Sequence, residues 1–271
     1  MKKIEGVIFD WAGTTVDFGC FAPVNAFVNI FKDVGIEVTM EEARGPMGLL
    51  KIDHIRAMLD MPRISALWKE KFGRVYNEQD VESLYTNFET GLMASLSEYT
   101  DPKPEVVETI NDLKNQGLKI GSTSGYTQKM MDVVVPEAAK KGYSPDFYIT
   151  PDATNSLGRP YPYMIYRNME ALKLSAAKNV IKVGDTIPDF AEANSAGVWA
   201  VGVIIGSSEM GLSIEEFDAL SEEDQEKAIN KTRQTFLQNG ADFTIKSMSE
   251  LPSMIEQINQ LNQGNKAEVH A

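Results

Sequence analysis

The chain has little of what several classes of protein require. It holds a single cysteine, Cys20, so no disulfide can form within it, which fits a reducing compartment and predicts a cytoplasmic location. No apolar run approaches the ~18 residues that a membrane-spanning helix needs. The N-terminus, Met1-Lys2-Lys3, leads directly into a strand-like stretch, without the long apolar segment of a signal peptide. We therefore expect neither membrane association nor secretion.

Positive charge is also scarce. The 26 lysines and arginines stand against 39 aspartates and glutamates, which gives a net charge of −13. Nucleic-acid-binding proteins need a basic surface, so nucleic acid is not expected as a partner. An anionic substrate would need a local positive site, which a cation bound between carboxylates could supply.

Strand-like and helix-like stretches alternate from about residue 100 to the C-terminal region. The helix-like stretch 104–116, for example, has apolar residues at helical spacing. Such alternation predicts βαβ units and hence an α/β fold with a doubly wound parallel sheet, similar to a Rossmann fold. Five strands are expected here, at residues 117–123, 146–150, 180–183, 199–205 and 241–245.

Residues 18 to about 98 break this alternation, because no strong strand pattern occurs there. Since a strand at 4–10 precedes this stretch and the other strands follow it, the stretch reads as an insertion that could act as a lid. Helices are expected within it at 23–34, 40–59 and 78–96. The predicted organisation is an α/β core domain of residues 1–18 and 99–262, a helical cap domain of residues 19–98, and a frayed tail of residues 263–271.

The first strand ends on an acid, Asp10, and a glycine and two threonines follow closely in Trp11-Ala12-Gly13-Thr14-Thr15. Ligands of open α/β sheets bind at the carboxyl ends of the strands. A carboxylate held there can act as a nucleophile, a metal ligand or both. Taken alone, however, an aspartate at a strand end most often caps a turn or a helix.

Three further pieces follow later strands. Ser124 and Gly125 offer a hydroxyl and backbone amides that suit a phosphate oxygen. Arg159 offers a charged fork to the same group. Asp185 and Asp189 could complete an oxygen-ligand site for a hard cation. Each piece also has an ordinary explanation as a turn, a surface charge or a helix cap, and it is their joint occurrence that indicates a single site.

These pieces, in this order, resemble the four motifs of the haloacid dehalogenase superfamily of phosphotransferases, including a helical cap inserted after the first motif. Within the superfamily the chain resembles the phosphonoacetaldehyde hydrolase (phosphonatase) family. One departure is Ser124, where that family would have threonine, and the hydroxyl is kept. The resemblance covers nearly the whole chain and is most specific at residues 9–17 (FDWAGTTVD), 44–54 (RGPMGLLKIDH) and 158–162 (GRPYP).

The resemblance implies cleavage of the carbon–phosphorus bond of phosphonoacetaldehyde, giving acetaldehyde and phosphate, in 2-aminoethylphosphonate degradation. Lys51 would form a Schiff base with the aldehyde, and Asp10 would attack phosphorus to form an aspartyl phosphate. The resemblance also implies a homodimer joined through the cap. Mg²⁺ would be held by Asp10, the carbonyl of Ala12 and Asp185, with Asp189 as a further or water-mediated ligand, while the substrate would contact Ser124, Gly125, Arg159, His54, Met47 and Tyr126.

Several of these residues have alternative interpretations. From its spacing alone Lys51 reads as an exposed helix lysine. His54 lies three residues later on the same helix face and could shuttle protons, or it could be a surface or capping histidine. Met47 and Tyr126 could be ordinary packing residues. Cys20 could reach the site, but a buried structural thiol is the favoured interpretation.

Two other functions compete with this one. Many phosphoryl-transfer enzymes with this opening read Asp-x-Asp, and the second aspartate handles protons. Here that position is Ala12, which counts against an ordinary phosphatase or phosphomutase of the superfamily. A non-catalytic binding module with the same fold would be expected to have lost Asp10, Arg159 or the acidic pair, and all of them are present.

Overall fold

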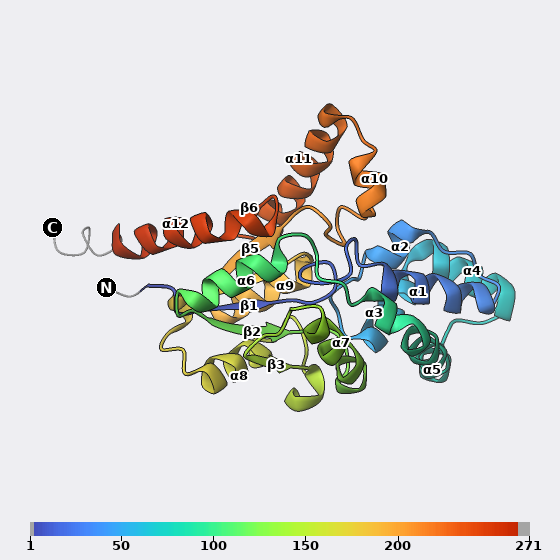
Figure 1. The fold of residues 1–271 in the computed structure, drawn as a ribbon. Helices are drawn as coiled ribbons and strands as arrows, with labels where there is room; N and C mark the ends of the chain where they lie inside the picture. The colour runs from blue at the N-terminus through green and yellow to red at the C-terminus, as the bar shows by residue number, and fades with distance from the viewer. Residues whose placement is uncertain (1–2, 265–271) are drawn as a thin grey trace.

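The computed structural model describes residues 3–264 and has a six-stranded parallel sheet at its centre (Figure 1). The strand order β3-β2-β1-β4-β5-β6 confirms the predicted doubly wound α/β fold. All six expected strands are present; β4 is one residue longer than its predicted range, and the other five are shorter than theirs. Their bounds are β1 (Gly6–Phe9), β2 (Lys119–Thr123), β3 (Phe147–Ile149), β4 (Val180–Gly184), β5 (Trp199–Val203) and β6 (Phe243–Ile245).

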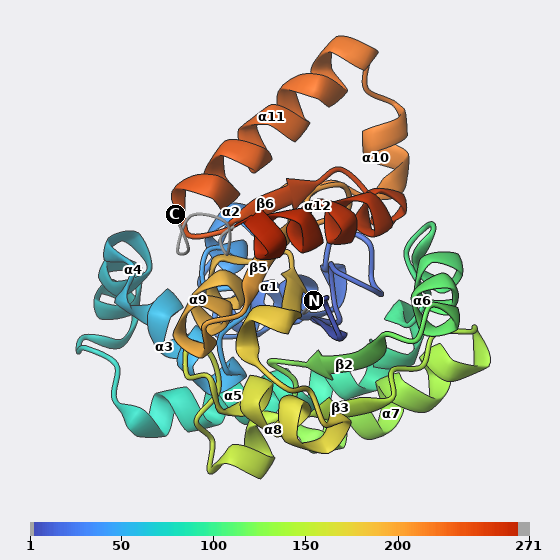
Figure 2. The ribbon, with the colours of Figure 1, turned by 90° about the vertical axis from the view of Figure 1, so that its left-hand side faces the viewer.

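Helices cover both faces of the sheet, and Figure 2 shows α6 and α7 on one side with α8 and α9 on the other. The central strand β1 is buried along its whole length, as expected for a strand between two helical layers. Val7 and Phe9 pack into one apolar cluster, while Ile8 packs into the other. The helices that pack on the sheet in the first cluster include α6 (Val106–Asn115), α7 (Gln128–Lys140) and α12 (Leu251–Gly264), and those in the second include α8 (Tyr163–Leu172), α9 (Ile187–Ala196) and α11 (Glu222–Gln238).

Five of the helices that lie between β1 and β2 in the sequence, α1 to α5, gather beyond one end of the sheet (Figure 1). We call residues 19–98, which hold them, the helical insert. Its division from the core as a separate domain stays a prediction. The helices are α1 (Phe21–Asp33), α2 (Met40–Arg44), α3 (Lys51–Asp60), α4 (Pro62–Phe72) and α5 (Glu78–Ser95).

Two predictions for the helical insert were wrong. The helix expected over 40–59 is two helices, because Gly45-Pro46 follows α2 and Gly48 has a φ of 93°, which only glycine adopts readily. Helix α4 was not expected. Its signal was present in the sequence, since Pro62 stands at the first helical position and Ile64 and Trp68 lie four residues apart on its buried face.

The remaining elements are short. Helix α10 (Ile214–Asp218) precedes α11, and four 3₁₀ turns span Leu96–Tyr99, Pro151–Thr154, Ala177–Asn179 and Met248–Glu250. Within residues 3–264 no helix is both long and apolar enough to cross a membrane. Of the tail predicted at 263–271, residues 265–271 lie outside the described residues.

Candidate active site

The predicted site residues meet at the carboxyl ends of the central strands. Asp10 follows β1, Ser124 follows β2 and Asp185 follows β4, and β1 lies between β2 and β4 in the sheet. Parallel strands place these ends side by side. A small cavity of about 20 Å³ lies there, with walls from both the sheet edge and the helical insert. Its lining includes Asp10, Ala12, Cys20, Met47, Lys51, Ser124, Gly125, Tyr126 and Arg159.

Arg159 is buried against Asp10. Its Nη2 donates to Asp10 Oδ1 at 2.5 Å and also lies 3.0 Å from Asp189 Oδ1. Burial alone would lower the pKa of Arg159, but the carboxylates around it raise that pKa above its usual value. The guanidinium is therefore fixed as a cation at the floor of the cavity.

Three buried acids, Asp10, Asp185 and Asp189, bring carboxylate oxygens within 4.8 Å of one another. Burial, followed by the charges of Asp10 and Asp189, raises the pKa of Asp185 to about 8. Thr14 Oγ1 donates to Asp185 at 2.6 Å, which orients the carboxylate. Hard divalent cations such as Mg²⁺ prefer carboxylate oxygens, and a bound cation would relieve this crowding of like charge. The residues therefore fit a divalent metal.

Asp189 differs from the other two acids in its partners. Thr186 Oγ1 donates to its Oδ2 at 2.6 Å, and Lys182 Nζ lies 3.0 Å from its Oδ1. Burial would raise the pKa of Asp189, but Arg159 and Lys182 lower it below its usual value. Asp189 is thus held as a carboxylate by the protein's own donors.

The helical insert approaches this edge closely, because glycines stand where the two parts meet. A Cβ at Gly125 would lie 3.0 Å from the carbonyl oxygen of Leu49. A Cβ at Gly48 would lie only 2.3 Å from Thr186 Oγ1. Side chains at these positions would push the insert away from the sheet edge, so the glycines keep the cavity small.

Lys51 enters the cavity from the first turn of α3. Its side chain is buried, so the alternative interpretation as an exposed helix lysine was wrong. Its Nζ lies 3.9 Å from Met47 Sδ and 5.1 Å from the centre of the Tyr126 ring. Burial lowers the pKa of Lys51, and the charge of Asp10 only partly opposes this. A larger share of Lys51 is therefore neutral than for a lysine in water.

His54 lies one turn after Lys51 and is also buried, so its interpretation as a surface histidine was wrong. Its ring stacks on Phe27 with centroids 3.7 Å apart, and its Nε2 donates to the carbonyl of Ala43 at 3.0 Å. Burial and the charge of Lys51 hold the pKa of His54 well below its usual range. A neutral histidine thus ties α3 to α2, and the proton-shuttle role stays a prediction.

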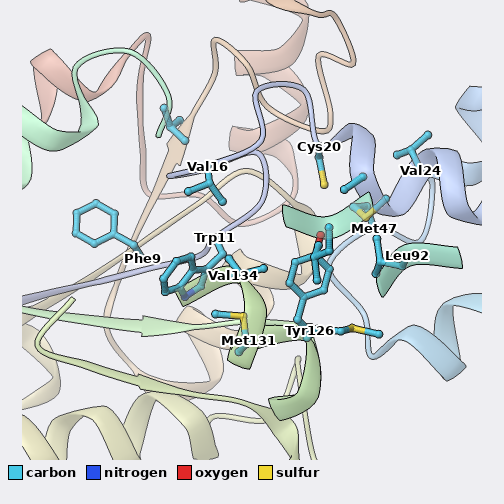
Figure 3. Packing of buried hydrophobic residues seen from close by; sticks show 14 of the residues in the cluster. Phe9, Trp11, Val16, Cys20, Val24, Met47, Leu92, Tyr126, Met131 and Val134 are labelled. Carbon is cyan, nitrogen blue, oxygen red and sulfur yellow. The ribbon is translucent and has the colours of Figure 1, made fainter. Parts of the chain in front are cut away.

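Apolar side chains surround Lys51, and Figure 3 shows Cys20, Met47 and Tyr126 gathered where the helical insert meets the sheet. Cys20 is buried, as expected for a structural thiol, and it also reaches the site, because it lines the cavity. Burial, with the charges of Asp17 and Asp185, raises the pKa of Cys20 well above its usual value. The thiol is therefore protonated and contributes a small, uncharged wall.

A model of the haloacid dehalogenase-like hydrolase family matches residues 4–197 of the chain. The chain belongs to this family. The match includes β1, the whole helical insert and the strand ends that carry Ser124 and Asp185. This haloacid dehalogenase-like hydrolase is also similar over nearly its full length to individual proteins of known name.

The phosphonoacetaldehyde hydrolase of Lysinibacillus sphaericus is 59% identical over 95% of this chain and 96% of its own length. That of Bacillus cereus is 52% identical over 94% and 97%. A bifunctional phosphonoacetaldehyde hydrolase/aminoethylphosphonate transaminase of Clostridioides difficile is 55% identical, and the match covers 40% of that longer chain. Among solved structures, a phosphonoacetaldehyde hydrolase-like protein from Oleispira antarctica matches with a TM-score of 0.91 and 38% identity, covering 95% of this chain and 93% of that one.

Two site residues of this haloacid dehalogenase-like hydrolase were missed from the sequence. Glu192 Oε2 accepts a hydrogen bond from Arg159 Nε at 3.2 Å, and Lys182 Nζ lies 3.5 Å from the same oxygen. A lysine in the middle of the apolar run Val180-Ile181-Lys182-Val183 was an available signal, because buried strands rarely hold an unpaired charge. Glu192, three residues after Asp189, shares its helix face.

Proposed function

We propose that this protein hydrolyses the carbon–phosphorus bond of phosphonoacetaldehyde, which gives acetaldehyde and phosphate. The observation that carries the proposal is a buried lysine and a buried aspartate, Lys51 and Asp10, that line one small cavity. The full-length similarity to proteins named phosphonoacetaldehyde hydrolase supports it.

A lysine is needed because a carbon–phosphorus bond has no leaving oxygen. Cleavage leaves the bonding electrons on carbon, which is unfavourable without an electron acceptor. If the neutral amine of Lys51 condenses with the aldehyde and releases water, the protonated imine can take up these electrons as an enamine. At the ordinary lysine pKa of ~10.4, only about one amine in two to three thousand is neutral at pH 7. The burial of Lys51 increases that fraction.

Asp10 acts on the other side of the bond. Its carboxylate oxygen attacks phosphorus while the electrons of the breaking bond move toward the imine nitrogen, leaving an aspartyl phosphate and an enamine. Protonation of the enamine carbon and addition of water then release acetaldehyde and restore Lys51. A second water hydrolyses the aspartyl phosphate. Arg159, 2.5 Å from Asp10, is placed to orient the phosphoryl oxygens together with Ser124 and Gly125.

Ala12 fits the same scheme. It stands where an acid–base aspartate would protonate a leaving alkoxide, and its side chain lines the cavity without a titratable group. With an enamine as the leaving group no such acid is needed. Met47, Tyr126 and His54 are proposed to contact the substrate or to shape the Lys51 pocket.

Magnesium is the proposed cofactor, held by Asp10, the Ala12 carbonyl and Asp185, with Asp189 as a further or water-mediated ligand. Bound there, the cation would offset the repulsion between the Asp10 carboxylate and the phosphonate. Turnover should stop when a chelator removes the metal and return when magnesium is added back. An enzyme indifferent to chelators would contradict this assignment.

A homodimer joined through the helical insert and a cytoplasmic location complete the proposal. Both are supported by the family resemblance, and the location also by the lone, buried thiol Cys20. Sedimentation of the protein, followed by sedimentation of a variant with charged residues on the insert surface, tests the dimer.

The deciding experiment is reduction of the imine. Borohydride added with phosphonoacetaldehyde should inactivate the protein irreversibly, and mass spectrometry should find one substrate-derived adduct on the peptide that contains Lys51. Lys2, Lys3 and Lys32 are internal controls, because nothing in the sequence places them near the strand ends. In parallel, acetaldehyde release from phosphonoacetaldehyde is compared with phosphate release from an aryl phosphate. An adduct on another lysine, or preferred turnover of the aryl phosphate, would favour a phosphatase instead.

A further inference from the structure

Two charged residues that take no part in the proposed chemistry are buried behind Arg159. Lys182 in β4 and Glu192 in α9 have no solvent exposure. Burying a charge costs several kcal/mol even after the surroundings relax, unless partners compensate. We therefore asked what these two side chains contact and what the contacts do for Arg159.

Glu192 fixes one edge of the Arg159 guanidinium. Its Oε2 accepts from Arg159 Nε at 3.2 Å and from Thr123 Oγ1 at 3.0 Å. Arg159 Nη2 forms ion pairs with Asp10 and Asp189. Nη1 has a longer contact, 3.5 Å to the carbonyl of Gly48 in the helical insert. A planar group fixed at Nε and Nη2 has no freedom to rotate, so Nη1 stays at the cavity.

Lys182 shares the acids that lie against Arg159. Its Nζ is 3.0 Å from Asp189 Oδ1 and 3.5 Å from Glu192 Oε2, and it donates to Thr123 Oγ1 at 2.7 Å. Among the described residues, Arg159 and Lys182 are the two cations in salt-bridge contact with these carboxylates. Without Lys182, the charge of Arg159 would be balanced by the acids behind it and less of it would act on the cavity.

We propose that Lys182 and Glu192 are positioning residues for Arg159. Glu192 fixes the plane of the guanidinium, and Lys182 neutralises the carboxylates behind it, so that Arg159 faces a phosphoryl group. The inference rests on the proposed function only in assigning a phosphoryl group to Arg159, and it needs neither the imine at Lys51 nor a particular substrate.

The test uses Lys182→Met, which keeps the length and removes the charge, and Glu192→Gln, which keeps an acceptor for Arg159 Nε. Lys178→Met and Glu170→Gln make the same changes at exposed positions and serve as matched controls. Calorimetry measures binding of inorganic phosphate at a magnesium concentration that saturates the wild type, and again at a higher one. In the same preparations, borohydride trapping of acetaldehyde measures whether Lys51 still forms an imine.

We expect phosphate to bind about 10- to 100-fold more weakly to Lys182→Met and to Glu192→Ala, as is usual when an outer partner of a site residue is lost. Trapping on Lys51 should match that of the wild type, which also shows that each variant is folded. Glu192→Ala should weaken phosphate binding more than Glu192→Gln, because it leaves Arg159 Nε without an acceptor.

Unchanged phosphate binding in Glu192→Ala and Lys182→Met would overturn the inference. So would parallel losses of phosphate binding and trapping, which would mark a purely structural role. A loss that further magnesium restores would place the effect on the metal instead of on Arg159, and would also overturn it. If the wild type forms no imine with phosphonoacetaldehyde while the variants still lose phosphate binding, the proposed function fails and this inference stands.

Discussion

Two buried lysines in this molecule have opposite surroundings. Lys182 has carboxylate oxygens of Asp189 and Glu192 at 3.0 and 3.5 Å, whereas Lys51 has a thioether sulfur at 3.9 Å and an aromatic ring. A buried ammonium is stabilised by nearby carboxylates, and without them burial favours the neutral amine. Burial alone therefore does not define the role of a lysine. Its immediate partners decide whether it serves as a countercharge or as a nucleophile.

The same contrast divides the whole site. The sheet edge supplies a half that is dense in charge, where Asp10, Arg159 and Asp189 form ion pairs. The helical insert supplies a half that is mainly apolar, in which Lys51 lies beside Met47. We expect the charged half to act on the phosphoryl group and the apolar half on the aldehyde. If so, a change in one half should leave the other half's partial reaction intact.

Asp10→Asn should give the largest effect. The amide is a far poorer nucleophile, and loss of a nucleophile typically lowers kcat by more than about 10⁴-fold. Borohydride trapping of phosphonoacetaldehyde on Lys51 should persist, because the near-isosteric side chain leaves the apolar half in place. Single-turnover kinetics and mass spectrometry measure the two outcomes, with the exposed Asp112→Asn as control. Normal turnover would exclude the covalent route through Asp10.

Lys51→Arg should disable the apolar half of the site and leave the charged half intact. A guanidinium keeps the positive charge but stays protonated and forms no imine, so both trapping and turnover should disappear. Inorganic phosphate should still bind, because the charged half is unchanged. Calorimetry and trapping are compared in this variant and in Lys32→Arg, a change on the exposed side of α1. Cleavage of phosphonoacetaldehyde by Lys51→Arg would remove the central residue of the proposal.

Arg159→Ala should weaken the charged half without abolishing the apolar half. A hydrogen bond to a charged group is worth about 1.5–3 kcal/mol, so phosphate binding should weaken roughly 10- to 150-fold. Trapping of acetaldehyde on Lys51 should change far less. Equal losses in the two assays would place Arg159 elsewhere in the mechanism.

The smallest expected effect comes from giving Lys51 the kind of partner that Lys182 has. Imine formation speeds up with rising pH as Lys51 loses its proton, and the lowered pKa of Lys51 places this rise below the ~10.4 of free lysine. In Met47→Glu a carboxylate beside Nζ should raise the pKa of Lys51 and move the rise about 1–3 pH units higher. Trapping rates from pH 6 to pH 11 measure the shift.

Met47→Leu is the control, since it keeps the apolar wall and costs less than about 1.5 kcal/mol of stability. Its pH profile should overlay that of the wild type. A profile for Met47→Glu that also overlays the wild type would mean that Met47 does not determine the environment of Lys51.

The strand ends that carry the acids could be predicted because a mainly apolar run is followed directly by an aspartate, as at Phe9-Asp10 and Gly184-Asp185. The helical insert was predicted as a segment but not in its internal detail, since Gly45-Pro46 ends one helix and the burial of His54 depends on Phe27 from another. Local patterns do not contain such contacts between elements.

The partner of Lys182 and Glu192 could not be predicted, for the same physical reason. Their partner Arg159 comes from a loop before α8, and only the packing of that loop against β4 and α9 joins the three side chains. A buried charge can be suspected from its apolar neighbours in the sequence, but its partner is set by the tertiary structure.

Because Gly125 touches the helical insert, the size of the side chain at this position should set the distance between the two halves of the site. A Cβ there would meet the carbonyl oxygens of Leu49 and Gly48 at 3.0 and 3.3 Å, and the backbone needs no positive φ. Alanine should therefore act as a wedge one methyl group thick that holds the helical insert back from the sheet. A series of alanine, serine and valine at position 125 would vary the opening in steps, and would offer protein engineers a way to admit aldehydes larger than the present cavity accepts.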